Sequence, residues 1–125
     1  MEQDFLAFLV SRGQLPQQRV DAIRQQVHIT REPIGAIAFA HGLLTGEDID
    51  VILTAQRDHY SPFGQIASEQ GLLTQGQVET LVQIQHARAA LSMAEALSLA
   101  GLMPMPQLLG LLSEYFAPAR AAKAA

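Results

Sequence analysis

Residues 33–56 read PIGAIAFAHGLLTGEDIDVILTAQ, and residues 62–85 read PFGQIASEQGLLTQGQVETLVQIQ. The second stretch is a near copy of the first. Both begin with Pro, a hydrophobic residue and Gly, both carry GLLT in the middle, and both end in Gln. Each copy has 24 residues, and the five residues RDHYS separate them. A repeat of fixed period predicts a fold in which one supersecondary unit is used more than once.

The period continues in weaker form on both sides of the two copies. Gly13 lies 29 residues before Gly42, and Gly101 lies 30 residues after Gly71. The four expected units span about residues 4–27, 33–56, 62–85 and 92–115. The outer two keep the hydrophobic pattern but lose the polar details, as terminal repeats that cap a stack do.

Each unit carries the signals of a short helix followed by a longer one. In the second copy, Ser61 is the expected N-cap, and Pro62 suits the first helical position. Gly71 is expected to end the short helix in a left-handed conformation. Thr74 and Gln77 have the spacing of a capping box, which predicts that the second helix starts there. The first copy repeats these signals.

The second helix of the second copy is expected to run from about Gln75 to Arg88. The chain has no alternating β-branched runs, which argues against strands. The sequence therefore predicts an all-α fold of about four tandem helix-turn-helix hairpins, packed as one compact domain over residues 1–118, with a disordered tail at residues 119–125. The two central copies should pack against each other with approximate two-fold or screw symmetry, and the outer units should close the ends.

Composition excludes several classes of function. Among 125 residues there are eight Lys and Arg, for a net charge of −4, and they form no basic cluster of the kind that binds nucleic acid. The absence of Cys excludes disulfides and thiolate metal sites. No apolar run approaches the roughly 20 residues of a membrane span, and the first residues lack the basic start of a signal peptide. We expect a soluble, cytoplasmic, bacterial-type protein without membrane insertion.

The residues that usually carry catalysis or bind metal are not arranged for either. The four His form no ligand pair of the usual spacing, and the acids suit helix starts and solvated surfaces. No nucleophile elbow, P-loop or dinucleotide-binding fingerprint is present. We therefore expect no enzyme activity and no bound metal.

The two copies resemble a motif of the N-terminal domain of the ATPases that drive type II secretion and type IV pilus assembly. In that family two 24-residue motifs, R-L-G-x-x-L-x-x-x-G-x-x-x-x-x-x-L-x-x-x-L-x-x-Q, are separated by five residues, and the best understood branch binds cyclic di-GMP. The matching residues are Ile34, Gly35, Gly42, Ile49, Leu53 and Gln56 in the first copy, and Phe63, Gly64, Gly71, Val78, Val82 and Gln85 in the second. Since no Walker A motif is present, the chain resembles the regulatory module standing alone.

The chain departs from the family at two motif positions. The Arg of the first position is Pro33 in one copy and Pro62 in the other, and the Leu of the sixth position is Ala in both. Arg is well suited to phosphate contact and to stacking on guanine. Arg31 and Arg57 lie near the motif starts and are the expected substitutes.

The resemblance implies two equivalent half-sites for a ligand with two guanines and two phosphates. Aliphatic side chains would cover the purine faces, and backbone N–H groups near the helix starts would meet the phosphates. Gln56 and Gln85 would pair with a guanine edge or fix the loop of the other copy. Gly35 and Gly64 would permit either a ligand or a second helix to come close. The expected ligand-binding residues are Arg31, Ile34, Gly35, Leu43, Gln56, Arg57, Phe63, Gly64, Leu72 and Gln85.

The leading hypothesis is a regulatory module that binds cyclic di-GMP, needs no other cofactor, and docks to a partner protein of a secretion, pilus or signalling system. The alternative is a protein–protein adaptor that kept the fold and lost the ligand, which the two prolines favour. A DNA-binding helix-turn-helix array is a weaker option because the chain is acidic.

The C-terminal residues 96–116 are unusually apolar. Most should form core, while Met105, Leu109 and Phe116 are candidate contacts for a partner or a homodimer.

Overall fold

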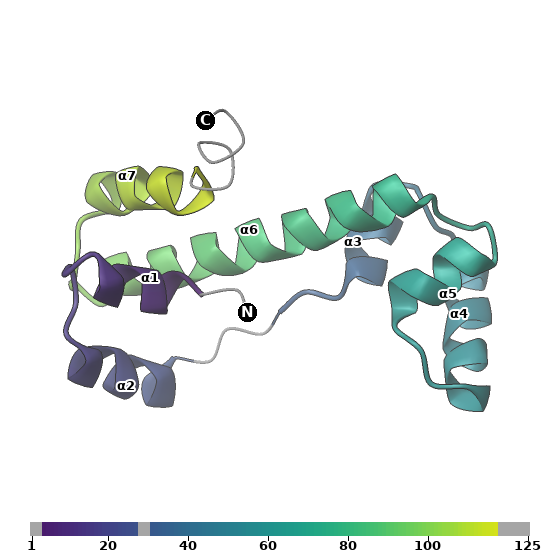
Figure 1. Cartoon of the computed structure of the whole chain (residues 1–125), viewed down its shortest axis with the longest axis horizontal. Coiled ribbons are helices and arrows are strands. Elements are labelled where there is room, and N and C mark those ends of the chain that lie inside the picture. Colours follow the sequence, from purple (N-terminus) through teal and green to yellow (C-terminus); the bar gives the residue numbers. More distant parts are fainter. Residues whose placement is uncertain (1–3, 28–30, 118–125) are drawn as a thin grey trace. The chain divides into compact units, whose positions relative to one another are not determined.

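The computed structural model describes residues 4–27 and 31–117, and all regular structure within them is helical (Figure 1). The helices are α1 (Phe5–Ser11), α2 (Gln17–Gln26), α3 (Ile34–Ala40), α4 (Gly46–Asp58), α5 (Phe63–Glu69), α6 (Gln75–Leu99) and α7 (Met105–Phe116). The expected all-α class is confirmed. In the described residues, no helix is long and apolar enough to cross a membrane. The expected tail at residues 119–125 lies outside the described residues.

Four glycines form the tight turns that follow helices α1, α3, α5 and α6. Gly13, Gly42, Gly71 and Gly101 have φ angles of 70°, 75°, 73° and 77°. Glycine adopts this left-handed conformation without the steric cost that a Cβ atom brings. The prediction that Gly42 and Gly71 end their short helices is confirmed, and the same turn occurs at both weaker repeats.

The two expected capping boxes are both present. The Asp48 N–H donates to Thr45 Oγ1 at 3.1 Å, and the Thr45 N–H donates to Asp48 Oδ2 at 2.9 Å. Thr74 and Gln77 exchange the corresponding bonds at 3.0 and 2.9 Å. Each box satisfies two backbone donors that a helix start leaves without intrahelical partners.

The predicted N-cap at Ser61 is wrong. Pro62 itself is the N-cap, with an extended backbone (φ −57°, ψ 144°), and helix α5 begins at Phe63 without a side-chain cap. Pro33 has the same role before α3. Proline suits this position because its ring fixes φ near −65° and its missing N–H would have had no intrahelical partner.

The prediction that the helix starting near Gln75 ends near Arg88 is also wrong. Helix α6 continues to Leu99 over 25 residues, so the first helix of the fourth expected unit is the last part of α6. The physical reason lies in residues 86–91, HARAAL, which replace the RDHYS spacer before Pro62. They contain neither Gly nor Pro and are rich in Ala, the best helix former, so nothing ends the helix there.

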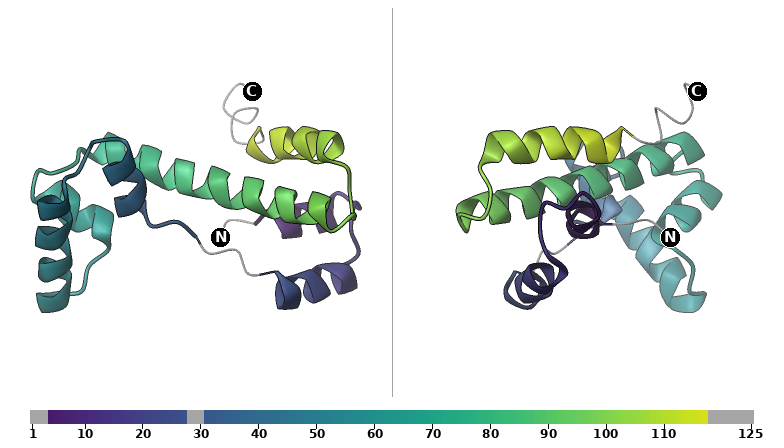
Figure 2. Two further views of the ribbon diagram at one scale, coloured as in Figure 1. Left: turned by 180° about the vertical axis from the view of Figure 1, so that it is seen from behind. Right: turned by 60° about the vertical axis from the view of Figure 1, so that its left-hand side comes forward.

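Contacts divide the chain into two compact units. Unit 1 comprises the chain up to residue 30 and from residue 88 onward, and unit 2 comprises residues 31–87. Unit 1 contains α1, α2, the last part of α6 and α7 (Figure 2). Unit 2 contains α3, α4, α5 and the first part of α6. The expectation of one folding domain over residues 1–118 stays a prediction, because two units that share a helix can still unfold together.

The core of unit 2 is built from pairs of residues that are 29 positions apart. Its eight buried residues are Ile37 and Ile66, Ala38 and Ala67, Leu44 and Leu73, and Ile52 and Leu81. Helix α5 packs against both α3 and α4. Burial of a large aliphatic side chain stabilises a fold by about 1.5–3 kcal/mol, so Ile52 and Leu81 are the main anchors of their two helices.

Unit 1 has a core of its own, in which the outer hairpins pack on each other. Helix α1 contacts α2 and α7. The ring of Tyr115 lies edge-on to Phe5 and to Phe8, with centroids 5.5 and 5.3 Å away. At the surface, Asp4 caps α1 through the Ala7 N–H and accepts two hydrogen bonds from Arg24 at 2.7 and 2.9 Å.

Candidate functional site

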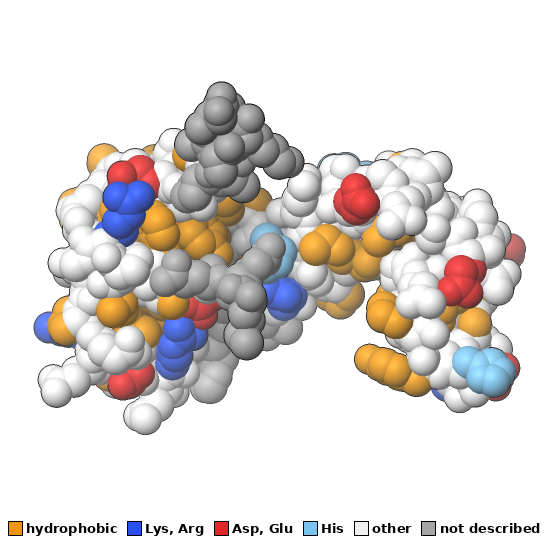
Figure 3. Space-filling view, in the orientation of Figure 1, with side chains coloured by type: hydrophobic (Ala, Val, Ile, Leu, Met, Phe, Trp, Pro, Cys, Tyr) orange, Lys and Arg blue, Asp and Glu red, His pale blue; other side chains and the backbone are white. Residues whose placement is uncertain are grey.

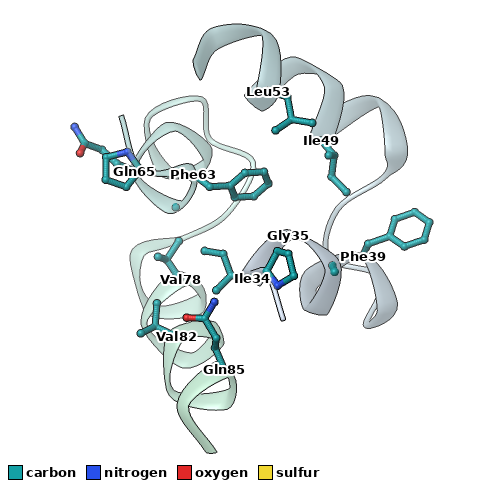
Figure 4. Close-up of a pocket in the computed structure, with 14 residues that line it drawn as sticks. Ile34, Gly35, Phe39, Ile49, Leu53, Phe63, Gln65, Val78, Val82 and Gln85 are labelled. Atoms are coloured by element: carbon teal, nitrogen blue, oxygen red, sulfur yellow. The ribbon is translucent and has the colours of Figure 1, made fainter. Parts of the chain in front are cut away.

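Unit 2 contains an open cavity of about 820 Å³ between its two hairpins (Figure 4). Most of its walls come from six pairs of residues related by the 29-residue shift. These pairs are Pro33 and Pro62, Ile34 and Phe63, Gly35 and Gly64, Ala36 and Gln65, Ile49 and Val78, and Leu53 and Val82. Phe39 and Gln85 complete the lining, and their counterparts Ser68 and Gln56 do not line the cavity. Both copies of the motif therefore build this one cavity.

The cavity exists because two glycines let the hairpins approach closely. A Cβ atom on Gly35 would lie 2.8 Å from Cζ of Phe63. A Cβ atom on Gly64 would lie 2.6 Å from Cγ1 of Val78 and 3.3 Å from Cδ1 of Ile34. Real Cβ contacts are longer than these. Gly35 thus makes room for Phe63 of the other hairpin, and Gly64 makes room for Val78 of its own hairpin and Ile34 of the other. Both glycines also form part of the cavity wall.

Two glutamines connect the hairpins beside the cavity. Gln85 donates from Nε2 to the Glu32 carbonyl at 2.9 Å, and Gln56 donates from Nε2 to the Ser61 carbonyl at 3.0 Å. Each acceptor immediately precedes the proline that starts the other motif. Of the two roles expected for these glutamines, the structure places both in the second, which is to fix the loop of the other copy.

The predicted ligand-binding residues separate into two groups. Ile34, Gly35, Phe63, Gly64 and Gln85 line the cavity. The other five do not line it. Leu43 lines a second, smaller cavity of about 510 Å³ with His41 and the start of α6, Leu72 packs against the core, and Gln56 forms its bond to Ser61. Arg31 and Arg57 are exposed.

Sequence reasoning had left several lining residues out of the site. Ile49, Leu53, Val78 and Val82 match the family motif and line the cavity, but they are not among the expected ligand-binding residues. The signal that could have found them is their place at the same two motif positions in both copies. Phe39, which is 57% exposed, gave no signal, since its counterpart in the second copy is a serine.

The residues that line the cavity are uncharged. None of the 14 described residues that line it carries a charge, and its polar side chains are amides. No group of three or more His, Asp or Glu that could hold a metal ion is found in the part of the chain that the structure describes. The cavity can therefore bind flat or branched apolar groups and can read hydrogen bonds through Gln85.

The three predicted partner contacts lie on α7 in unit 1. Met105 packs against the core of unit 1, whereas Leu109 is 52% exposed and Phe116 is 43% exposed. The ring of Phe116 lies 5.2 Å from that of Tyr115, centroid to centroid. Hydrophobic side chains reach the surface of both units in the view of Figure 3, so exposure alone does not distinguish these residues.

Comparisons with known proteins found no match: no family model matches the chain, and neither a curated protein nor a solved structure does. The resemblance to the secretion and pilus ATPases therefore rests on the motif spacing alone.

Proposed function

We propose that the chain is a cytoplasmic regulatory module, without catalytic activity, that binds a cyclic dinucleotide such as cyclic di-GMP in the cavity of unit 2. One observation carries the proposal. The cavity is lined by six pairs of residues, and each pair combines one residue from each copy of a motif that resembles a cyclic di-GMP-binding motif. A ligand made of two linked nucleotides has two similar halves, and a cavity with paired walls offers each half a similar surface.

The paired contacts also support a proposed tandem arrangement. Gly35 contacts Phe63, and the residues one repeat away, Gly64 and Ile34, contact each other. The buried core pairs follow the same shift. We propose that the two hairpins of unit 2 are tandem repeats related by an approximate two-fold axis through the cavity, with α6 serving both the second repeat and unit 1.

The size and lining of the cavity suit purine bases. A volume of about 820 Å³ falls within the usual range of about 300–1,000 Å³ for small-molecule sites. Aliphatic and aromatic walls can cover the faces of the bases. The phosphates would stay at the solvent-exposed mouth, because the walls hold no charge to compensate them, and Arg31 and Arg57 are the proposed contacts to them.

Occupancy would be transmitted by changing the relation between the hairpins. A ligand that contacts α3, α4, α5 and α6 together stabilises one arrangement of these helices over others, and a partner that binds this arrangement preferentially reads the ligand. The partner would belong to a secretion, pilus or signalling system, as the resemblance implies.

The test is isothermal titration calorimetry of the purified chain with cyclic di-GMP, with GTP and ATP as controls. We expect saturable binding of cyclic di-GMP alone. A variant with both Gln56→Leu and Gln85→Leu should lose binding. Gln107→Leu is a control in unit 1, where Gln107 donates from Nε2 to Oε1 of the Gln14 side chain at 3.0 Å. Unchanged affinity in the double variant would refute the site.

The neutral lining favours a second candidate, a protein–protein adaptor. An apolar cavity edged by exposed Phe39, Leu53 and Val82 can also accept hydrophobic side chains of a protein, and this requires no cation. Under this hypothesis no cyclic dinucleotide releases heat or raises the melting temperature. A stable complex with one protein partner then forms without nucleotide, and Leu53→Glu disrupts it while leaving the helical content unchanged.

A further inference from the structure

The two halves of the cavity in unit 2 are not equivalent. On one side, α4 presents Ile49 and Leu53, and the ring of Phe63 lies opposite them (Figure 4). On the other side, α6 presents the shorter Val78 and Val82, and the residue equivalent to Phe63 is the aliphatic Ile34. One half thus offers an aromatic ring, whereas the other is purely aliphatic at the same place.

The two glutamines that line the cavity also differ between its halves. Gln85 lines the cavity beside Val82 and Ile34, while its counterpart Gln56 does not line it. On the Phe63 side, Gln65 is a lining residue, but its amide points away from the Phe63 ring and donates to Glu69 at 2.9 Å. The half with the aromatic ring therefore has no amide turned toward the ligand space.

We infer that the cavity is selective for a cyclic dinucleotide with two different bases, with adenine on the Phe63 side and guanine on the Gln85 side. This inference rests on the proposed function. It replaces a symmetric ligand by a mixed one, cyclic GMP-AMP, because the walls differ where the two bases would lie.

Hydrogen-bond chemistry assigns guanine to the Gln85 side. Gln85 uses Nε2 to bind the Glu32 carbonyl, and this bond orients the amide and leaves Oε1 as an acceptor. The Watson–Crick edge of guanine carries two neighbouring donors, N1–H and the N2 amino group, that one amide oxygen can accept together. Guanine on the Phe63 side would bury these donors against apolar side chains, which is unfavourable.

The lack of a polar partner assigns adenine to the Phe63 side, where the base can stack on the ring. Bases stack on aromatic side chains through their π faces, whatever their edges carry. Adenine has one amino group and no ring N–H on its Watson–Crick edge, so it loses less than guanine when no polar side chain meets that edge. The Ile34 side lacks an aromatic ring, so a base bound there gains no stacking of this kind.

The test compares three ligands by calorimetry under identical conditions: cyclic di-GMP, cyclic di-AMP and cyclic GMP-AMP, each with two 3′–5′ linkages. We expect cyclic GMP-AMP to bind about tenfold more tightly than either symmetric ligand, the discrimination of one well-placed hydrogen-bonded contact to a base. Equal or tighter binding of a symmetric ligand would overturn the inference while leaving the proposed function in place. Failure of all three to bind would overturn both.

Three single variants distinguish the loss of an assigned contact from a general loss of ligand affinity. Gln85→Leu should weaken cyclic GMP-AMP about tenfold more than it weakens cyclic di-AMP, because it removes the acceptor for guanine in addition to the bond between the hairpins. Gln56→Leu removes only the equivalent bond between the hairpins, and it should weaken all three ligands by the same factor, so that the ligand preference is kept. Phe63→Ile, which makes the second copy match Ile34, should weaken all three ligands about equally, because stacking does not depend on the base, and should keep the preference of cyclic GMP-AMP over cyclic di-GMP. The same loss of affinity for all ligands in all three variants would contradict the inference.

Discussion

Gln85 donates its side-chain amide to the backbone carbonyl of Glu32, 53 residues earlier in the chain, at 2.9 Å. The bond from Gln56 to Ser61, at 3.0 Å, is its counterpart after a shift of one repeat. The last residue of each motif therefore holds the residue that precedes the first residue of the other motif. Because a residue before proline prefers an extended backbone, each bond fixes the chain where it enters the opposite short helix.

These exchanged bonds should stabilise unit 2 about equally. We expect Gln56→Leu and Gln85→Leu each to lower the free energy of unfolding by about 1 kcal/mol, the usual net contribution of one hydrogen bond. Urea denaturation followed by circular dichroism measures both values. If one variant proved neutral while the other was destabilised, the two bonds would not be equivalent in strength.

The two glycines at the contact between hairpins should differ in their tolerance of a methyl group. Gly64→Ala places Cβ against Val78 Cγ1, and a β-branched side chain has little rotamer freedom, so we expect a loss of about 1–3 kcal/mol. Gly35→Ala meets the far end of the Phe63 ring, which can move, and should cost less. In a Gly64→Ala background, Val78→Ala should be less damaging than in the native chain. Additive effects would argue against this contact.

The turn glycines should resist substitution for a different reason than the contact glycines. Gly42 and Gly71 have nothing within 4 Å of a built Cβ atom, so only their positive φ angles resist a side chain. Gly42→Ala should lower stability by about 1–2 kcal/mol, and Gly42→Asn should cost less, since Asn adopts this conformation more readily. Gly46→Ala, in α4 with equally open surroundings, is the matched control and should not destabilise the protein.

Local chemistry made much of the fold predictable. The turns at Gly42 and Gly71 and the capping boxes at Thr45 and Thr74 depend on residues within a few positions of each other, so their signals are complete in a short stretch of sequence. The repeat then predicted that the two copies would use the same devices. Five of the ten predicted ligand-binding residues line the cavity because the motif positions that carry them face each other.

Other features of the fold and of the site could not be predicted from the 29-residue repeat alone. The regular period suggested that the helix would end near Arg88, although the residues there favour a continuous helix, and α6 runs on to Leu99. The roles of Arg31 and Arg57 were assigned from closeness in sequence. Neither residue lines the cavity, so their contact with phosphates at its mouth stays a prediction. The hydrogen bond between Gln85 and Glu32 joins residues 53 positions apart, and only the packing of the hairpins selects that acceptor.

In unit 1, the carboxylate of Asp4 combines two roles, because it caps α1 through the Ala7 N–H and binds the guanidinium of Arg24. The hydrogen bond from Arg24 is the main reason that the pKa of Asp4 is lowered. A lowered pKa means that the unfolded chain takes up a proton more readily than the folded chain. The contribution of the charged Asp4 to stability is therefore present above its unfolded pKa, about 3.9, and is lost as the pH falls through the lower folded pKa.

Variants of Asp4 should separate the cap from the charge. At pH 7, Asp4→Ala removes both and should cost at least about 1 kcal/mol, the usual effect of losing an N-cap. Asp4→Asn keeps an acceptor for the Ala7 N–H and should cost less. The difference in unfolding free energy between the native chain and Asp4→Asn should be largest near neutral pH. It should shrink below pH 4, because the unfolded chain then takes up a proton at Asp4, and it should be lost once the pH falls through the lower folded pKa. Urea denaturation at pH 7 and pH 3 measures this difference, and a difference that did not change with pH would mean that the ion pair with Arg24 contributes nothing to stability.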